Sequence, residues 1–133
     1  MKKTIKKSIS EVIFTMLILS IIYYGIDGIP LAGLPKEKDV SYIEIYSASL
    51  DEIRICTESE DIEKCVKIVH LLNYKFGTSK QGPPLITITY HLKDGEKLSI
   101  SANDNTVYWK GKAHTIKDDN GDFFVGVIEG MFF

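Results

Sequence analysis

The chain has 133 residues and a net charge of −2, and its 44% hydrophobic and 26% charged content are those of an ordinary globular protein. This length suits one small domain with its own core, and no repeat or low-complexity segment interrupts it. The charge is uneven, since the first eleven residues carry four Lys and one Glu whereas the remainder carries 12 basic and 17 acidic residues. The acidic remainder lacks the electrostatic footprint of a nucleic-acid-binding protein, so we expect no nucleic-acid partner.

The amino terminus combines a basic stretch with an apolar run. Met1–Glu11 holds the four lysines, and the 15 residues of Val12–Ile26 carry no charge. This order is typical of an export or anchoring signal, and the lysines favour a cytoplasmic amino terminus. A membrane helix needs roughly 20 residues, so a span has to extend back to Ser8, with Glu11 at the inner rim of the bilayer. We therefore predict a single-pass signal-anchor over residues 1–27, with the C-terminal domain extracellular.

Two other interpretations of this segment stay open. A cleaved signal peptide would also begin with a basic and an apolar region, but Ile26–Gly33 offers no clean small-residue cleavage site. A buried helix of a soluble protein is the second. A lipid anchor is disfavoured because the first cysteine, Cys56, lies far beyond the apolar run. Secretion after cleavage is therefore the main alternative to a retained anchor.

Residues 28–39 are predicted to form a linker, because two prolines and two glycines argue against regular structure. The domain of residues 40–133 then begins with a predicted antiparallel hairpin. Its first strand, Val40–Tyr46, is rich in β-branched and aromatic residues. Its second strand, Glu52–Thr57, alternates two isoleucines on one face with Arg54 and Cys56 on the other, which predicts a half-buried strand.

An amphipathic helix packed on a sheet is predicted for Glu60–Tyr74, where apolar residues recur at helical spacing. Thr57–Glu60 fits a capping box at its start. Residues 123–132 also have a helical apolar period after a group of Asp and Asn residues, which favours a C-terminal helix over a final strand.

Between the two helices, alternating segments separated by turn residues predict an antiparallel meander of about four strands. These segments are Leu85–Leu92, Lys97–Ser101, Thr106–Lys110 and Ala113–Lys117. The predicted fold class is therefore α+β. Its order is an N-terminal membrane helix, a β-hairpin, an amphipathic helix, the meander and a short C-terminal helix.

Residues capable of chemistry do not form a recognisable catalytic or metal-binding motif. The three histidines, His70, His91 and His114, have no metal-binding spacing, and no nucleophile elbow or phosphate loop is present. A carboxylate pair of Glu44 and Glu52 on the predicted hairpin is more readily explained as a solvated sheet face. We therefore expect no catalytic residue, no metal and no cofactor.

The two cysteines, Cys56 and Cys65, could form a disulfide if the domain is exported. The predicted strand-turn-helix corner can bring them within bridging distance but need not, and two buried free thiols are the alternative.

Two segments resemble interaction surfaces. Tyr108, Trp109, Lys110 and Lys112 combine the only tryptophan with two lysines near a hairpin turn, and aromatic residues are frequent binding anchors. Because side chains alternate along a strand, one of the two aromatic residues is expected to point into the core. The second candidate is the loop Phe76–Pro84, since binding residues favour loops on a rigid scaffold.

The sequence also resembles a small uncharacterised domain of exported, membrane-anchored proteins of Gram-positive bacteria. The residues that carry this resemblance are Ile29-Pro30-Leu31, Leu34-Pro35-Lys36, Asp39-Val40, Ile43-Glu44-Ile45, Leu71-Leu72-Asn73, Thr78-Ser79-Lys80-Gln81 and Lys93-Asp94-Gly95. The most specific piece is Thr78, Ser79, Lys80 and Gln81 after the helix, whereas Ala32-Gly33 and the Gly-Pro-Pro after Gln81 depart from the pattern. The resemblance implies an exterior location and the order hairpin, helix, meander, but no activity.

These observations favour a membrane-anchored extracytoplasmic binding or accessory module that is not an enzyme. Its expected partners are the membrane, through the N-terminal helix, and a protein or another envelope component. An envelope enzyme with an unrecognised site is the alternative. A deep pocket with convergent titratable groups would favour the enzyme, and an exposed apolar patch would favour binding.

Overall fold

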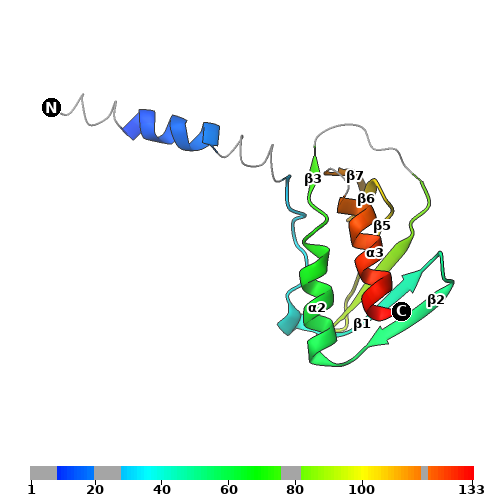
Figure 1. The fold of residues 1–133 in the computed structure, drawn as a ribbon. Helices are drawn as coiled ribbons and strands as arrows, with labels where there is room; N and C mark the ends of the chain where they lie inside the picture. The colour runs from blue at the N-terminus through cyan, green and yellow to red at the C-terminus, as the bar shows by residue number, and fades with distance from the viewer. Residues whose placement is uncertain (1–8, 20–27, 76–81, 118–119) are drawn as a thin grey trace.

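One antiparallel sheet carries two helices against one of its faces (Figure 1). The computed structural model describes residues 9–19, 28–75, 82–117 and 120–133. After a helix at residues 9–19, the elements in chain order are η1 (Glu37–Asp39), β1 (Val40–Ser47), β2 (Glu52–Cys56), α2 (Ser59–Val69), β3 (Tyr74–Lys75), β4 (Ile86–Leu92), β5 (Lys97–Ala102), β6 (Thr106–Trp109), β7 (Lys112–Ile116) and α3 (Asn120–Phe132). The domain is therefore α+β, as predicted.

The sheet has seven strands in the order β2-β1-β4-β5-β6-β7-β3, and each neighbouring pair is antiparallel. The predicted hairpin is confirmed as β1–β2, and the predicted meander as β4–β7. The pairing of β1 with β4 joins the hairpin directly to the meander. The strand count is one higher than predicted, because β3 adds a two-residue strand along β7 at the far edge.

Helix α2 ends at Val69, not at Tyr74 as predicted. Tyr74 instead exchanges two backbone hydrogen bonds with Ile29 and pairs with Ile116 in the sheet, so the chain has to leave the helix before it. The predicted capping box is also wrong, because the N-cap residue is Glu58 and its side chain makes no capping hydrogen bond. Acidic residues in the first turn still suit the helix dipole there.

Helix α3 confirms the predicted C-terminal helix and lies beside α2 over the sheet (Figure 1). It buries Phe124 and Ile128 against the core. Its first turn approaches the β5–β6 turn so closely that a Cβ on Gly121 would lie 2.8 Å from the Asn103 carbonyl oxygen and would collide with the Asp104 carbonyl. Only glycine fits this contact without movement of the backbone.

The core fills the space between the helices and one face of the sheet. Alternate residues along each strand point into it, as the pleat requires. They include Ile43, Ile45, Ile86, Ile88, Tyr90, Ile100, Ala102, Val107 and Trp109, all of which are buried. On β2 the buried residue of this face is Cys56, which shares the face with Glu52 and Arg54. Ile53 and Ile55 point to the opposite face with 60% and 62% of their surface exposed. The alternation predicted for β2 is thus present, but its apolar side is not the covered side.

The chain that precedes β1 lies partly against the domain. Residues 28–39, predicted to be a linker, bury Leu31 in the core and end in η1. Within the predicted anchor the structure describes residues 9–19, which are helical. In the part of the chain that the structure describes, no helix is long and apolar enough to cross a membrane. The remainder of the predicted anchor, residues 1–8 and 20–27, lies outside the described residues.

Candidate interaction surface

The structure divides the predicted Tyr108–Lys112 patch between the two faces of the sheet. Trp109 points to the helix-covered face, is only 4% exposed, and donates a hydrogen bond from Nε1 to the Ala32 carbonyl oxygen at 2.7 Å. Tyr108 points to the other face, where its hydroxyl donates to the Gly82 carbonyl oxygen at 2.7 Å and accepts from the Gly82 N–H at 2.9 Å. Both aromatic residues hold neighbouring chain segments in place.

Of the two lysines of the patch, Lys110 lies in the tight turn between β6 and β7, and Lys112 directly follows the turn. Lys110 and Gly111 both have positive φ, 51° and 75°, as a two-residue type I′ hairpin turn requires. The Lys110 ammonium lies 5.6 Å from the centroid of the Trp109 ring, a cation–π contact. Trp109, Lys110 and Lys112 border a small depression next to residues 31–32.

This depression is too small for an ordinary ligand. Its volume is about 200 Å³, below the range of typical small-molecule sites. His114 lines it and lies against the Tyr74 ring, with 4.2 Å between the ring centroids. Burial and the nearby Lys112 charge lower the pKa of His114. The other predicted loop residues, Thr78, Ser79, Lys80 and Gln81, lie outside the described residues.

The face of the sheet opposite α2 and α3, here called the open face, has no helix on it in the described part of the chain. Near the β2 edge it is apolar, with Ile53, Ile55 and the 38% exposed Tyr46. In the centre it is hydroxylated: Thr87 and Ser101 lie 3.2 Å apart, and Thr89 and Ser99 lie 3.1 Å apart, each pair on neighbouring strands. The open face thus joins an apolar strip to a row of hydrogen-bonding groups.

His91 fills the end of this face near the start of β1. Its ring stacks on Tyr42 with 4.0 Å between centroids, and its Nε2 lies 3.0 Å from Glu44 Oε1. Glu44 is therefore engaged on the open face, whereas Glu52 points to the helix-covered side. The hypothetical pair of Glu44 and Glu52 does not form.

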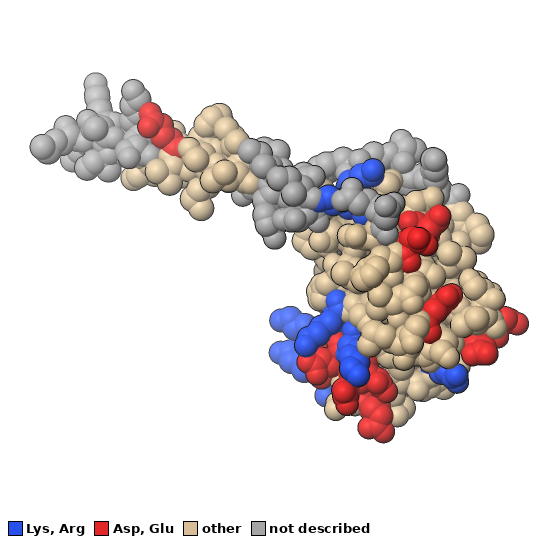
Figure 2. All heavy atoms as spheres, in the orientation of Figure 1, with Lys and Arg blue, Asp and Glu red and all other residues tan. Residues whose placement is uncertain are grey.

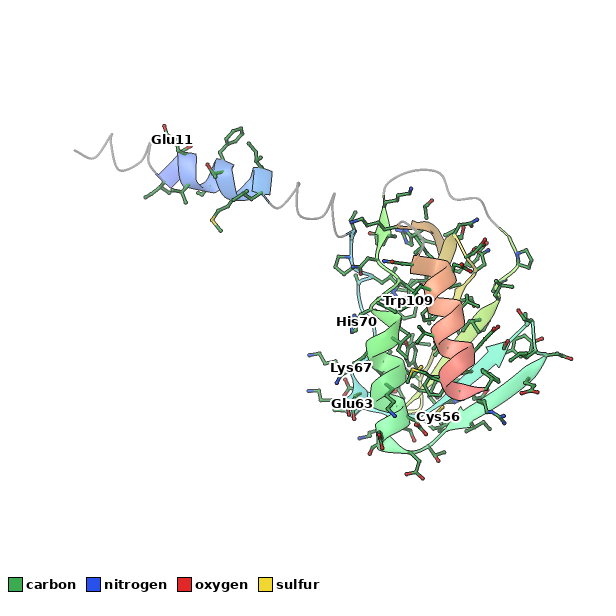
Figure 3. The ribbon with its side chains drawn as sticks, viewed as in Figure 1. Glu11, Cys56, Glu63, Lys67, His70 and Trp109 are labelled. Atoms are coloured by element: carbon green, nitrogen blue, oxygen red, sulfur yellow. The ribbon has the colours of Figure 1, made fainter. Side chains whose placement is uncertain are left out.

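The remaining chemistry-bearing residues lie in two places, the core and the end of α2. Cys56 and Cys65 are both buried, and burial raises the pKa of each thiol, that of Cys65 to about 12. The disulfide between them stays a prediction. His70 is exposed at the end of α2, on the same helix as the Glu63–Lys67 ion pair (Figure 3). Across the described residues, no group of three or more His, Cys, Asp or Glu side chains could hold a metal ion.

A second depression, of about 450 Å³, lies where η1 and β1 meet the β2–α2 turn. Its titratable lining residues are Glu37, Lys38 and Lys93, all exposed. Acidic and basic side chains gather around the start of α2, whereas the surface over α3 carries acidic side chains among uncharged ones (Figure 2). Comparisons of the chain with protein-family models, with curated proteins and with solved structures found no match.

Proposed function

We propose that this chain is a membrane-tethered, extracytoplasmic binding or accessory module without catalytic activity, and that it contacts its partner through the open face. One observation carries the proposal: the two helices cover a single side of a seven-stranded sheet, and isoleucines with about 60% of their surface exposed lie on the other. Exposed apolar patches bordered by polar groups are typical of protein interaction sites.

The open face offers both affinity and orientation. Covering the exposed parts of Ile53 and Ile55 would contribute roughly 2–3 kcal/mol, by the usual value for burial of apolar side chains. The Thr and Ser hydroxyls beside them supply donors and acceptors that fix how a partner lies. Because these groups lie on paired strands, little conformational entropy is lost when a partner binds.

The membrane tether is supported by the basic and apolar order of residues 1–27 and by the resemblance to exported domains of Gram-positive bacteria. Two contacts just after residue 27 determine how far the domain can lie from the membrane. Ile29 exchanges backbone hydrogen bonds with Tyr74, and Ala32 accepts a hydrogen bond from Trp109. A tether ending near residue 27 would therefore hold the domain close to the membrane surface and raise the local concentration of a membrane-bound partner.

A non-catalytic role is supported by the distribution of the titratable groups. His91 lies on the open face and His114 on the covered face, while His70 lies on the outer side of α2. General acid–base chemistry needs such groups within hydrogen-bond reach of one substrate. Because His91 and His114 lie on opposite faces of the sheet, these two side chains do not converge on one substrate.

The proposal is tested with a photo-crosslinking amino acid placed at Ser99, an exposed position in the centre of the open face. The matched control carries it at Phe123, which is 61% exposed on α3. We expect adducts of one defined mass from Ser99 in intact cells and none of that mass from Phe123. Adducts from Phe123 alone, or no adduct from Ser99 across growth conditions, would contradict the proposal.

A further inference from the structure

The β2 strand leaves a sheet edge open. It pairs with β1 along Glu52–Cys56, and no other strand of the described residues lies beside it. Proteins commonly protect such edges with proline, lysine or a bulge. β2 has no proline, lysine or bulge, since its register with β1 is continuous and its sequence is Glu-Ile-Arg-Ile-Cys. The charged residues of this short strand, Glu52 and Arg54, are of opposite sign and share the helix-covered face. At the opposite edge, β3 offers only two residues.

The order of charges along β2 makes this edge complementary to itself. We infer that β2 pairs antiparallel with β2 of a second copy of this chain, around a two-fold axis that passes through Ile53 perpendicular to the sheet. Ile53 then faces its own copy, and each Glu52 faces Arg54 of the other copy. Opposite charges directly across an antiparallel pair are stabilising.

Neighbouring registers lack this match. A two-fold axis perpendicular to the sheet keeps the open faces of both copies on one side, so it has to pass through a residue and not between two residues. An axis through Arg54 would bring the two Arg54 side chains opposite each other, and like charges there are destabilising. An axis through Ile55 would place Arg54 opposite Cys56, which leaves Glu52 and Arg54 unmatched.

Arg54 is already held in position for the cross-copy contact. Its Nε donates to the Phe132 carbonyl oxygen at 2.9 Å, and its guanidinium carbon lies 5.6 Å from the Phe133 ring centroid. Its Nη2 lies 3.9 Å from Glu52 Oε2, and both side chains are 52% exposed. Two Arg and two Glu would therefore meet at the axis in a four-charge network, which is more stabilising than an isolated surface pair.

Pairing would join two sheets into one and place the exposed isoleucines of both copies side by side on a shared open face. This inference goes beyond the proposed function: it rests on the proposed membrane tether, but not on what the open face binds. A five-residue edge is short compared with the interface of a stable dimer, so a high local concentration in a membrane should favour the pair.

The test uses the full-length protein carrying Ile53→Cys, reconstituted in lipid vesicles and oxidised with copper phenanthroline. Residues directly opposite in an antiparallel pair have Cα atoms about 4.5–5.5 Å apart, within the range of a disulfide. The matched control is Ile55→Cys, equally exposed on the same strand, whose two copies would lie about 13 Å apart along the strand. We expect at least tenfold more disulfide dimer from position 53, and equal or greater crosslinking at position 55 would overturn the inference.

Charge variants test the register in the Ile53→Cys background. Glu52→Arg alone should reduce crosslinking about tenfold, because the introduced guanidinium would face Arg54 of the other copy. A mixture of Glu52→Arg and Arg54→Glu chains should restore it, since opposite charges then face each other again. Arg54→Glu also removes the hydrogen bond to Phe132, so the fluorescence of the buried Trp109 is used to verify folding. Unchanged crosslinking by folded Glu52→Arg protein would overturn the inference without the second variant.

Discussion

Replacing Gly121 by Ala is expected to destabilise the domain, although the same change elsewhere in α3 is expected to stabilise it. Gly121 is buried under the β5–β6 turn, where a Cβ would lie 2.8 Å from the Asn103 carbonyl oxygen and would collide with the Asp104 carbonyl. Both obstacles are backbone, so they cannot rotate away as a side chain would. Either α3 or the turn has to move.

The magnitude follows from two opposing effects. Ala is favoured over Gly inside a helix by about 1 kcal/mol. Inserting an atom into a closely packed contact costs about 1–3 kcal/mol, and more where backbone has to shift. We therefore expect Gly121→Ala to lower the free energy of unfolding by about 1–2 kcal/mol. Gly126→Ala should raise it by up to about 1 kcal/mol, because a Cβ there meets nothing within 4 Å.

Thermal unfolding of the full-length protein in a mild detergent measures this difference. The buried Trp109 is the only tryptophan, so its fluorescence reports the domain alone. For a domain of this size, 1 kcal/mol corresponds to a shift of roughly 4–8 °C in the midpoint. The two variants should shift the midpoint in opposite directions. Equal stabilisation by both would refute the close contact between α3 and the β5–β6 turn.

Three further outcomes test other contacts. Trp109→Phe removes the indole hydrogen bond to the Ala32 carbonyl and should lower the free energy of unfolding by about 1–3 kcal/mol. Thermal unfolding monitored by circular dichroism measures this loss. An unchanged midpoint of unfolding would show that this hydrogen bond does not hold residues 31–32 against the domain. Cys56 and Cys65 should resist iodoacetamide in the native protein, because both thiols are buried and burial raises the pKa of each. Both should react after denaturation, as measured by mass spectrometry. If neither is alkylated after denaturation, the two residues form a disulfide. The pKa of His114 is lowered in the folded state, so the unfolded chain binds a proton at this residue more readily, and stability should fall as the pH drops through about 6.5. His114→Gln should flatten the dependence of the melting temperature on pH between about 7 and 5. An identical slope in the variant and the original protein would contradict the lowered pKa.

Periodicity predicted the elements whose signals are local. The strands of β4–β7 alternate over four or more residues each, and α3 has a helical apolar period, so both follow from the sequence. β3 does not follow from the sequence, because two residues are too few to show a period. Its extended conformation comes from the pairing of Tyr74 with Ile29 on one side and Ile116 on the other. The same pairing of Tyr74 explains why α2 ends at Val69, before the predicted end at Tyr74.

Alternation also shows which residues share a face, but not which face is covered. On β2 the isoleucines are the more apolar set, yet Arg54 and Cys56 face the helices because Phe132 and the buried side of α2 lie there. The same limit applies to the predicted patch. The sequence predicts that Tyr108 and Trp109 point to opposite faces, but the carbonyl that accepts the Trp109 indole hydrogen bond belongs to Ala32, 77 positions earlier.

One measurement tests most directly whether the domain lies outside the membrane with its open face covered. Ser99→Cys and Phe123→Cys variants are labelled with a membrane-impermeant maleimide in intact cells and as purified protein. The buried native thiols contribute little background. We expect Phe123→Cys to react at the same rate in both settings, and Ser99→Cys to react several-fold more slowly in cells. Labelling that requires cell lysis would contradict the exterior location, and equal rates for Ser99→Cys in both settings would contradict binding through the open face.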